Sequence, residues 1–169
     1  VALGRQSFAI ENPNRLAFFL LVNLLGGPGM NSLLNVSVRE RHGLVYSIEA
    51  NLTSFLDSGY WAIYFGTEPN QVNKSLKLIH KEFAKLQEKE LTAPQLKKIK
   101  SQLKGQLAMA EEGNLNFMLM MAKNLLDREK IESLEEIFTQ IDLVTAEQLQ
   151  HLAIDMLNPN ELSRLIFEP

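Results

Sequence analysis

Residues 44–66 constrain the fold more than any other part of the chain, because they predict an antiparallel hairpin. Within 44–55 apolar and polar residues alternate, which is typical of a strand with one buried face. Asp57-Ser58-Gly59 favours a turn, and the aromatic run 60–66 predicts the returning strand. The predicted inward face carries Leu44, Tyr46, Ile48, Ala50 and Leu52.

Most of the remaining chain predicts helices. Residues 15–25 are apolar nearly all round, which indicates a buried helix, and 68–90 repeat apolar residues every third or fourth position. Further helices are predicted from Thr92, over 114–126, from Ser133 and from Thr145. Two more strands are predicted, over 1–10 and, as a closing strand, over 162–167. The predicted fold class is α+β, an antiparallel sheet covered on one face by helices, with residues 1–169 forming a single domain.

Composition excludes several classes of protein. Hydrophobic residues make up 46% and charged residues 22%, which is typical of a globular domain and not of a disordered or membrane protein. The net charge of −3 leaves no basic excess for nucleic-acid binding. Cysteine is absent, so disulfides are excluded. The absence of cysteine does not identify the cellular compartment, for which the cytoplasm is slightly favoured over the periplasm. A first residue of Val1 indicates either a removed targeting segment or a piece of a longer chain.

Motifs for chemistry within this chain are missing. His42, His80 and His151 are far apart, and no H-x-x-E-H or H-E-x-x-H pair could place two imidazoles on one metal ion, so each histidine is interpreted as a surface or turn residue. There is no G-x-S-x-G elbow and no cysteine nucleophile. We therefore expect neither a metal site nor catalysis from this chain alone.

Two further clusters favour structural interpretations. The run 26–29, G-G-P-G, follows a predicted helix and lacks the Lys-Ser/Thr of a phosphate loop, so it predicts a helix–helix turn. Met109, Met118, Met120 and Met121 are expected to fill the core between helices. The alternative is an adaptable binding surface, with 114–126 facing a partner.

Arg39 and Tyr46 remain as candidate functional residues. On a helical wheel at about 100° per residue, Met30, Leu34 and Val38 set the apolar face and Arg39 points away from it. From the pattern alone, Arg39 is a solvated arginine. Tyr46 is a core tyrosine with a satisfied hydroxyl, because it shares the inward face of its strand.

A resemblance to a known family changes the interpretation of both residues. Five runs resemble, in order, the C-terminal domains of pitrilysin/insulinase-type zinc metallopeptidases, which include the mitochondrial processing peptidases. They are L-G-G-P-G-M-N-S-L-L, R-E-R-H-G-L-V-Y-S, D-S-G-Y-W-A-I-Y-F-G-T-E-P-N, L-T-A-P-Q-L-K-K-I-K-S-Q-L-K-G and I-D-L-V-T-A-E-Q-L-Q-H-L-A. Pro28, Leu34 and Gln95 depart from the family pattern and affect details of the turn and of one helix start.

The resemblance implies roles for Arg39 and Tyr46 in a two-domain enzyme. In this family an N-terminal domain carries the inverted zinc motif and the glutamate base, and a second domain of the same fold closes over it to form a chamber. Tyr46 would donate its phenol to the scissile carbonyl, and Arg39 would bind a substrate backbone carbonyl. The substrate would lie as an added strand on the catalytic domain.

The expected function is therefore that of a substrate-binding, chamber-closing C-terminal domain of a zinc endopeptidase acting on peptides or unfolded proteins. This chain would bind no cofactor, and zinc is expected in the N-terminal catalytic domain or a partner subunit. The other expected partner is the peptide substrate, with no nucleic acid and no membrane. The alternative is a domain of a non-catalytic subunit that serves as a protein-interaction or structural partner.

Overall fold

The computed structural model describes residues 1–111 and 113–167, and its centre is a four-stranded antiparallel sheet. The strands are β1 (Ala2–Ser7), β2 (Ser47–Ser54), β3 (Gly59–Gly66) and β4 (Ser163–Leu165), in the order β2-β3-β1-β4. The predicted hairpin is confirmed, with Ser47 opposite Gly66 at one end and Ser54 opposite Gly59 at the other. The strands predicted near both ends of the chain are also present, β1 between β3 and β4 and β4 at the edge.

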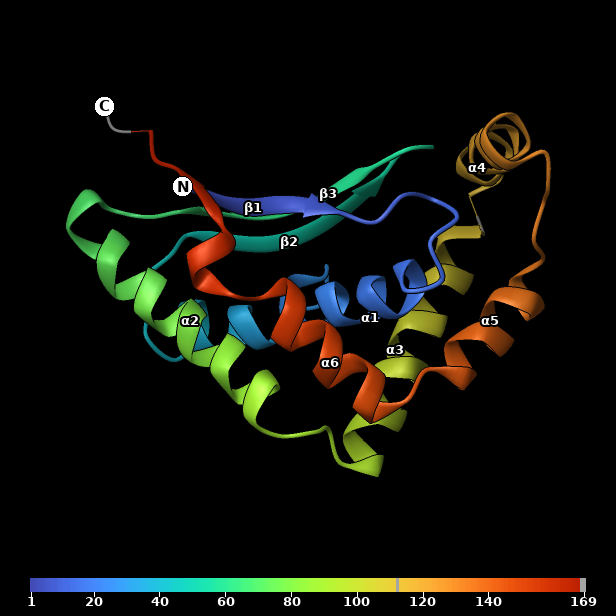
Figure 1. Ribbon diagram of the computed structural model, residues 1–169. Helices are drawn as coiled ribbons and strands as arrows, with labels where there is room; N and C mark the ends of the chain where they lie inside the picture. The colour runs from blue at the N-terminus through green and yellow to red at the C-terminus, as the bar shows by residue number, and fades with distance from the viewer. Residues whose placement is uncertain (112, 168–169) are drawn as a thin grey trace.

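Helices cover one face of this sheet and leave the other face open (Figure 1). They are α1 (Arg15–Gly26), α2 (Val72–Glu88), α3 (Ala93–Glu111), α4 (Asn114–Arg128), α5 (Leu134–Leu143) and α6 (Ala146–Met156). A π-helical segment, η1 (Asn35–Glu40), and two short 3-10 turns, η2 (Pro69–Gln71) and η3 (Pro159–Glu161), complete the elements. The predicted α+β class is confirmed. Within the described residues, no helix is both long enough and apolar enough to cross a bilayer.

The core lies between the sheet and the helices. Trp61 of β3 is fully buried and makes edge-to-face contacts with Phe18 of α1 and Phe83 of α2, with ring centroids 5.8 and 6.2 Å apart. Its strand neighbours Tyr60 and Tyr64 point to the open face and are exposed. Side chains along β3 therefore alternate between the buried aromatic layer and the open face, as an antiparallel sheet with one covered face requires.

The glycine-rich turn after α1 is confirmed as a connection between helices. Gly26 ends α1 where the helix meets β2, and a Cβ atom at this position would lie 2.6 Å from the backbone nitrogen of Ala50. Only glycine permits so close an approach of helix and strand backbones.

The methionine cluster departs from the expectation. Met109, Met118 and Met120 are exposed, by 73%, 58% and 39%, and Met121 is half-buried. The interpretation as core filling is therefore wrong for the first three. For Met118 and Met120 the physical reason is the position of α4, which packs on α3 and stands apart from the helix layer beneath the sheet (Figure 1). Met109 lies near the end of α3 and is exposed there.

Candidate functional site

Arg39 lies on η1, a helical segment with an unusual hydrogen-bond pattern. The amide of Arg41 donates to the carbonyl of Val36, five residues earlier, at 3.1 Å. Such π-helical turns are rare and are frequent at functional sites. The Arg39 side chain is 40% exposed, and its Nε lies 3.9 Å from the neighbouring Glu40 carboxylate. Its guanidinium is thus accessible and only loosely engaged.

Two of the three residues expected on the apolar face of this helix are buried. Leu34 and Val38 are fully buried, as expected, whereas Met30 is 71% exposed. Met30 lies in the turn that precedes the helix, where the helical periodicity does not apply.

A tight turn carries the chain from η1 into β2. Gly43 adopts φ of 58°, and its amide donates to the Arg39 carbonyl at 2.9 Å, while the amide of Leu44 donates to the Val38 carbonyl at 3.1 Å. A left-handed glycine that closes a helix in this way reverses the chain direction. Arg39 is thereby held beside the end of the sheet at which β2 begins.

A buried polar network fixes η1 against α2. Ser37 of η1 donates from Oγ to the carboxylate of Glu82 at 2.7 Å, and both residues are buried. Lys85 pairs with the same Glu82 oxygen at 2.8 Å. On the other side, the His42 ring lies 2.6 Å from the Ser37 carbonyl. Ser37 and Lys85 both donate to the buried Glu82 carboxylate. Because the carboxylate has these donors, it stabilises η1 at Ser37, two residues before Arg39.

Tyr46 is 68% exposed, so the interpretation as a core tyrosine is wrong. The backbone bends at Tyr46, and the regular alternation of β2 begins only at Ser47. The Tyr46 amide still donates to the Gly66 carbonyl at 2.8 Å, which extends the hairpin pairing by one bond. The backbone is thus fixed, while the ring projects into solvent.

The phenol of Tyr46 donates a hydrogen bond to the carboxylate of Glu68, which follows β3. This hydrogen bond, together with the negative charge of the carboxylate, raises the pKa of Tyr46 above its ordinary value. The phenol therefore keeps its proton at neutral pH and acts as a hydrogen-bond donor rather than a base.

The described residues do not form a metal site. Within residues 1–111 and 113–167, no group of three or more His, Cys, Asp or Glu side chains is placed to hold a metal ion. His42 and His151 are exposed, and His80 is half-buried with its ring 6.0 Å from that of Phe83. The donor set of this part of the chain thus does not fit a zinc ion.

Sequence reasoning missed Glu68 and Glu82. Glu82 carried a signal, because it lies three residues after Ile79 and four before Leu86, in the apolar stripe of α2. Glu68 could be found from the hairpin register, since Ser47 pairs with Gly66 and the residues just outside this pair lie near each other. Neither residue belonged to a recognised motif.

Comparisons with known proteins identify the family. Residues 1–103 match the family described as the peptidase M16 inactive domain. An uncharacterized zinc protease of Bacillus subtilis, YmxG, is 31% identical over 166 residues, which are 98% of this chain and 40% of that protein. The beta subunit of the mitochondrial-processing peptidase of Saccharomyces cerevisiae is 28% identical over 127 residues, 73% of this chain and 28% of that subunit. The chain thus spans well under half the length of these relatives.

The fold agrees with these sequence matches. A protease from Helicobacter pylori superposes with a TM-score of 0.83 at 22% identity, over 95% of this chain and 38% of that one. The resemblance of the sequence to this group of metallopeptidases is confirmed. This chain belongs to the peptidase M16 family and is its inactive, C-terminal type of domain.

Proposed function

We propose that residues 1–169 form the substrate-binding and chamber-closing domain of a zinc metalloendopeptidase that hydrolyses peptides or unfolded proteins. The observation that carries this proposal is the exposed, protonated phenol of Tyr46 at the end of the sheet where Arg39 is also held. Two accessible donors on a rigid backbone suit the recognition of peptide carbonyls.

Tyr46 is proposed to stabilise the charge that develops on the scissile carbonyl oxygen. A neutral phenol gives a short, strong hydrogen bond to an oxyanion, and a donor that is already positioned needs little reorganisation during the reaction. The raised pKa supports this role, because the proton must stay on the phenol. Donation to a substrate requires the phenol to turn away from Glu68 or to share its proton with both acceptors.

Arg39 is proposed to hold the substrate backbone near this phenol. Its guanidinium presents several donors in one plane and can bind carbonyl oxygens of an extended peptide. The Ser37–Glu82 hydrogen bond would limit the movement of the helix that presents it. This role is one of binding and orientation.

The zinc site is proposed to lie on an N-terminal catalytic domain, in the same polypeptide or in a partner subunit. Relatives named as zinc proteases are about two and a half times as long as the segment they share with this chain, which leaves room for such a domain. The residues of this chain are proposed to act on the substrate and not to hold the zinc.

The proposal is tested on the natural full-length protein with the variants Tyr46→Phe and Tyr60→Phe. Tyr60 is also an exposed tyrosine of this hairpin, but it lies next to the β2–β3 turn, at the opposite end of β3. We expect Tyr46→Phe to lower kcat for peptide cleavage by roughly 10²–10³-fold, the effect of losing one oxyanion donor. Tyr60→Phe should leave kcat unchanged. Zinc content is measured in parallel, and equal activity of the two variants would remove Tyr46 from the reaction.

A second candidate function is that of a non-catalytic subunit that serves as a structural or interaction partner. The apolar side chains exposed along α4 favour this possibility, since a surface of this kind suits a protein contact. A full-length protein that contains no zinc and cleaves no peptide, yet forms a stable complex, would support this second function.

A further inference from the structure

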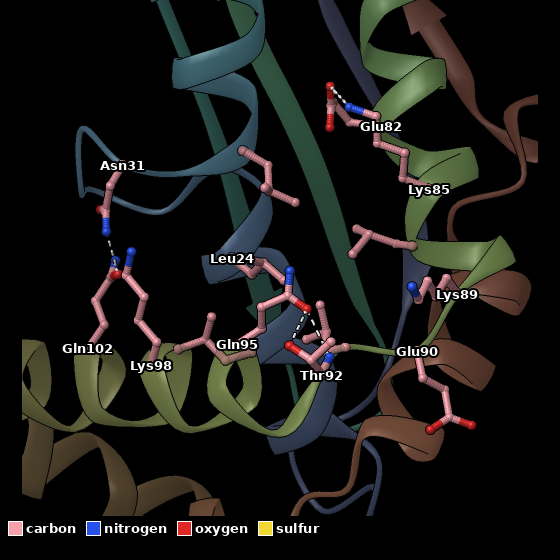
Figure 2. Close-up of a pocket in the computed structure, with 14 residues that line it drawn as sticks. Leu24, Asn31, Glu82, Lys85, Lys89, Glu90, Thr92, Gln95, Lys98 and Gln102 are labelled. Carbon is pink, nitrogen blue, oxygen red and sulfur yellow. Dashed lines mark hydrogen bonds and ion pairs between the residues drawn. The ribbon is translucent and has the colours of Figure 1, made fainter.

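A cavity of about 420 Å³ lies between the end of α2 and the start of α3 (Figure 2). Its apolar lining includes Leu24 of α1, Leu33, Leu86 and Ile99. The volume is in the range of cavities that hold small ligands or single large side chains. Neither Arg39 nor Tyr46 lines it, although Glu82 and Lys85 of the network that anchors η1 form part of one wall.

Gln95 offers only donors to this cavity. Its Oε1 accepts hydrogen bonds from both the amide and the hydroxyl of Thr92, each at 2.8 Å (Figure 2). Because the carbonyl end of the side-chain amide is occupied, its Nε2 remains to donate to a ligand.

The charged groups around the cavity leave a positive excess. Lys89 and Lys98 line it without an ion pair or hydrogen bond to any residue that the structure describes. The carboxylate of Glu82 is already paired with Lys85, and that of Glu90 turns away from the other lining side chains (Figure 2). Two ammonium groups and an amide donor therefore face the cavity, which favours an anionic group.

The opposite wall carries a pair of side-chain amides. Asn31 donates from Nδ2 to Oε1 of Gln102 at 2.8 Å, and both residues line the cavity (Figure 2). The Asn31 Oδ1 acceptor and the Gln102 Nε2 donor lie beside Gly29, and neither has another hydrogen-bond partner among the residues that the structure describes, so both can pair with a ligand. One acceptor and one donor match the N–H and C=O of a peptide group.

We propose that this cavity binds the C-terminal residue of a peptide chain that ends in an apolar side chain. The apolar side chain packs on the leucine and isoleucine lining. The terminal carboxylate is bound by the Gln95 amide and attracted by the ammonium groups of Lys89 and Lys98, which lie on either side of Gln95 (Figure 2). The preceding peptide group pairs with Asn31 and Gln102. A fatty acid has the carboxylate and the apolar chain but cannot use the amide pair. The site is independent of the function proposed for Arg39 and Tyr46.

The test is the binding of N-acetyl-Ala-Leu, as the free acid and as the C-terminal amide, to the full-length protein by calorimetry. We expect the amide to bind at least about tenfold more weakly, because it loses the charge-assisted hydrogen bonds. Decanoate is titrated as a second probe and is expected to bind more weakly than the peptide acid. Equal binding of acid and amide, no binding of the acid, or tighter binding of decanoate would each overturn the proposal.

Matched lysine variants locate the site. Lys89→Gln combined with Lys98→Gln should weaken binding of the peptide acid about tenfold. The control combines Lys81→Gln in α2 and Lys97→Gln in α3, which remove the same charge at exposed positions that do not line the cavity. If the control weakens binding as much as the first pair, the acid binds through overall charge, and the proposed site is wrong.

Discussion

The sheet with its underlying helices and the helix α4 present two contrasting regions. Beneath the sheet, buried aromatic rings join α1 and α2 to β3, and the Ser37–Glu82 bond joins η1, the segment with Arg39, to α2. In α4, by contrast, Leu115, Met118, Leu119, Leu125 and Leu126 are each more than half exposed. The candidate site is therefore built on elements that contribute to the core, whereas α4 adds apolar surface and little to the core.

The largest predicted difference between the two regions concerns buried and exposed apolar side chains. Trp61→Ala should lower the free energy of unfolding by about 3–5 kcal/mol, because it leaves a cavity between Phe18 and Phe83. Leu126→Ala, at a position 82% exposed in α4, should change it by less than about 0.5 kcal/mol. Urea denaturation measures both values. A large effect of Leu126→Ala would show that α4 is part of the core in solution.

A smaller effect is expected at the network that anchors η1. Ser37→Ala should lower the free energy of unfolding by about 1–3 kcal/mol, since the buried Glu82 carboxylate loses one of its donors. Ser54→Ala is the control, because its buried hydroxyl has no hydrogen-bond partner among the described residues. Equal effects of the two substitutions would contradict the anchoring role of Ser37.

The Tyr46–Glu68 pair gives a prediction that does not depend on stability. Glu68→Gln should lower the pKa of Tyr46 toward its ordinary value, because the charged acceptor that disfavours the phenolate is removed. The ultraviolet titration of the tyrosines, with Tyr46→Phe to identify the signal, measures this change. An unchanged titration curve would show that the hydrogen bond does not persist in solution.

The smallest effect is expected where α4 ends. Arg128 pairs with Glu132 and Glu11, and its hydrogen bond to Glu132 lowers the pKa of that carboxyl below its ordinary value. The stability from this pair is therefore present above the unfolded-state pKa of about 4.3 and is lost as the pH falls through the lower folded-state value. Glu132→Gln should be less stable than the natural protein at neutral pH and should approach it in acid. If the stabilities of Glu132→Gln and of the natural protein differed by the same amount at every pH, this assignment would be contradicted.

The α+β class and most element positions follow from sequence patterns alone. The alternation in 44–55, the turn at Asp57-Ser58-Gly59 and the apolar stripe of α2 act over a few residues, so they can be recognised without a structure. The helix start at Ser133 was predicted from an equally local pattern, and its capping box is present. The co-linear motifs also identified the family.

Exposure to solvent could not be derived from these patterns, because it depends on how the elements pack against one another. Tyr46 fits the inward pattern of its strand but lies at a backbone bend, and Met118 and Met120 fit a core pattern but lie on α4, which stands away from the core. The partners of Tyr46 and Ser37 are 22 and 45 residues away in sequence. Periodicity describes a residue's place on its own element, whereas burial and hydrogen bonding depend on which other elements cover it.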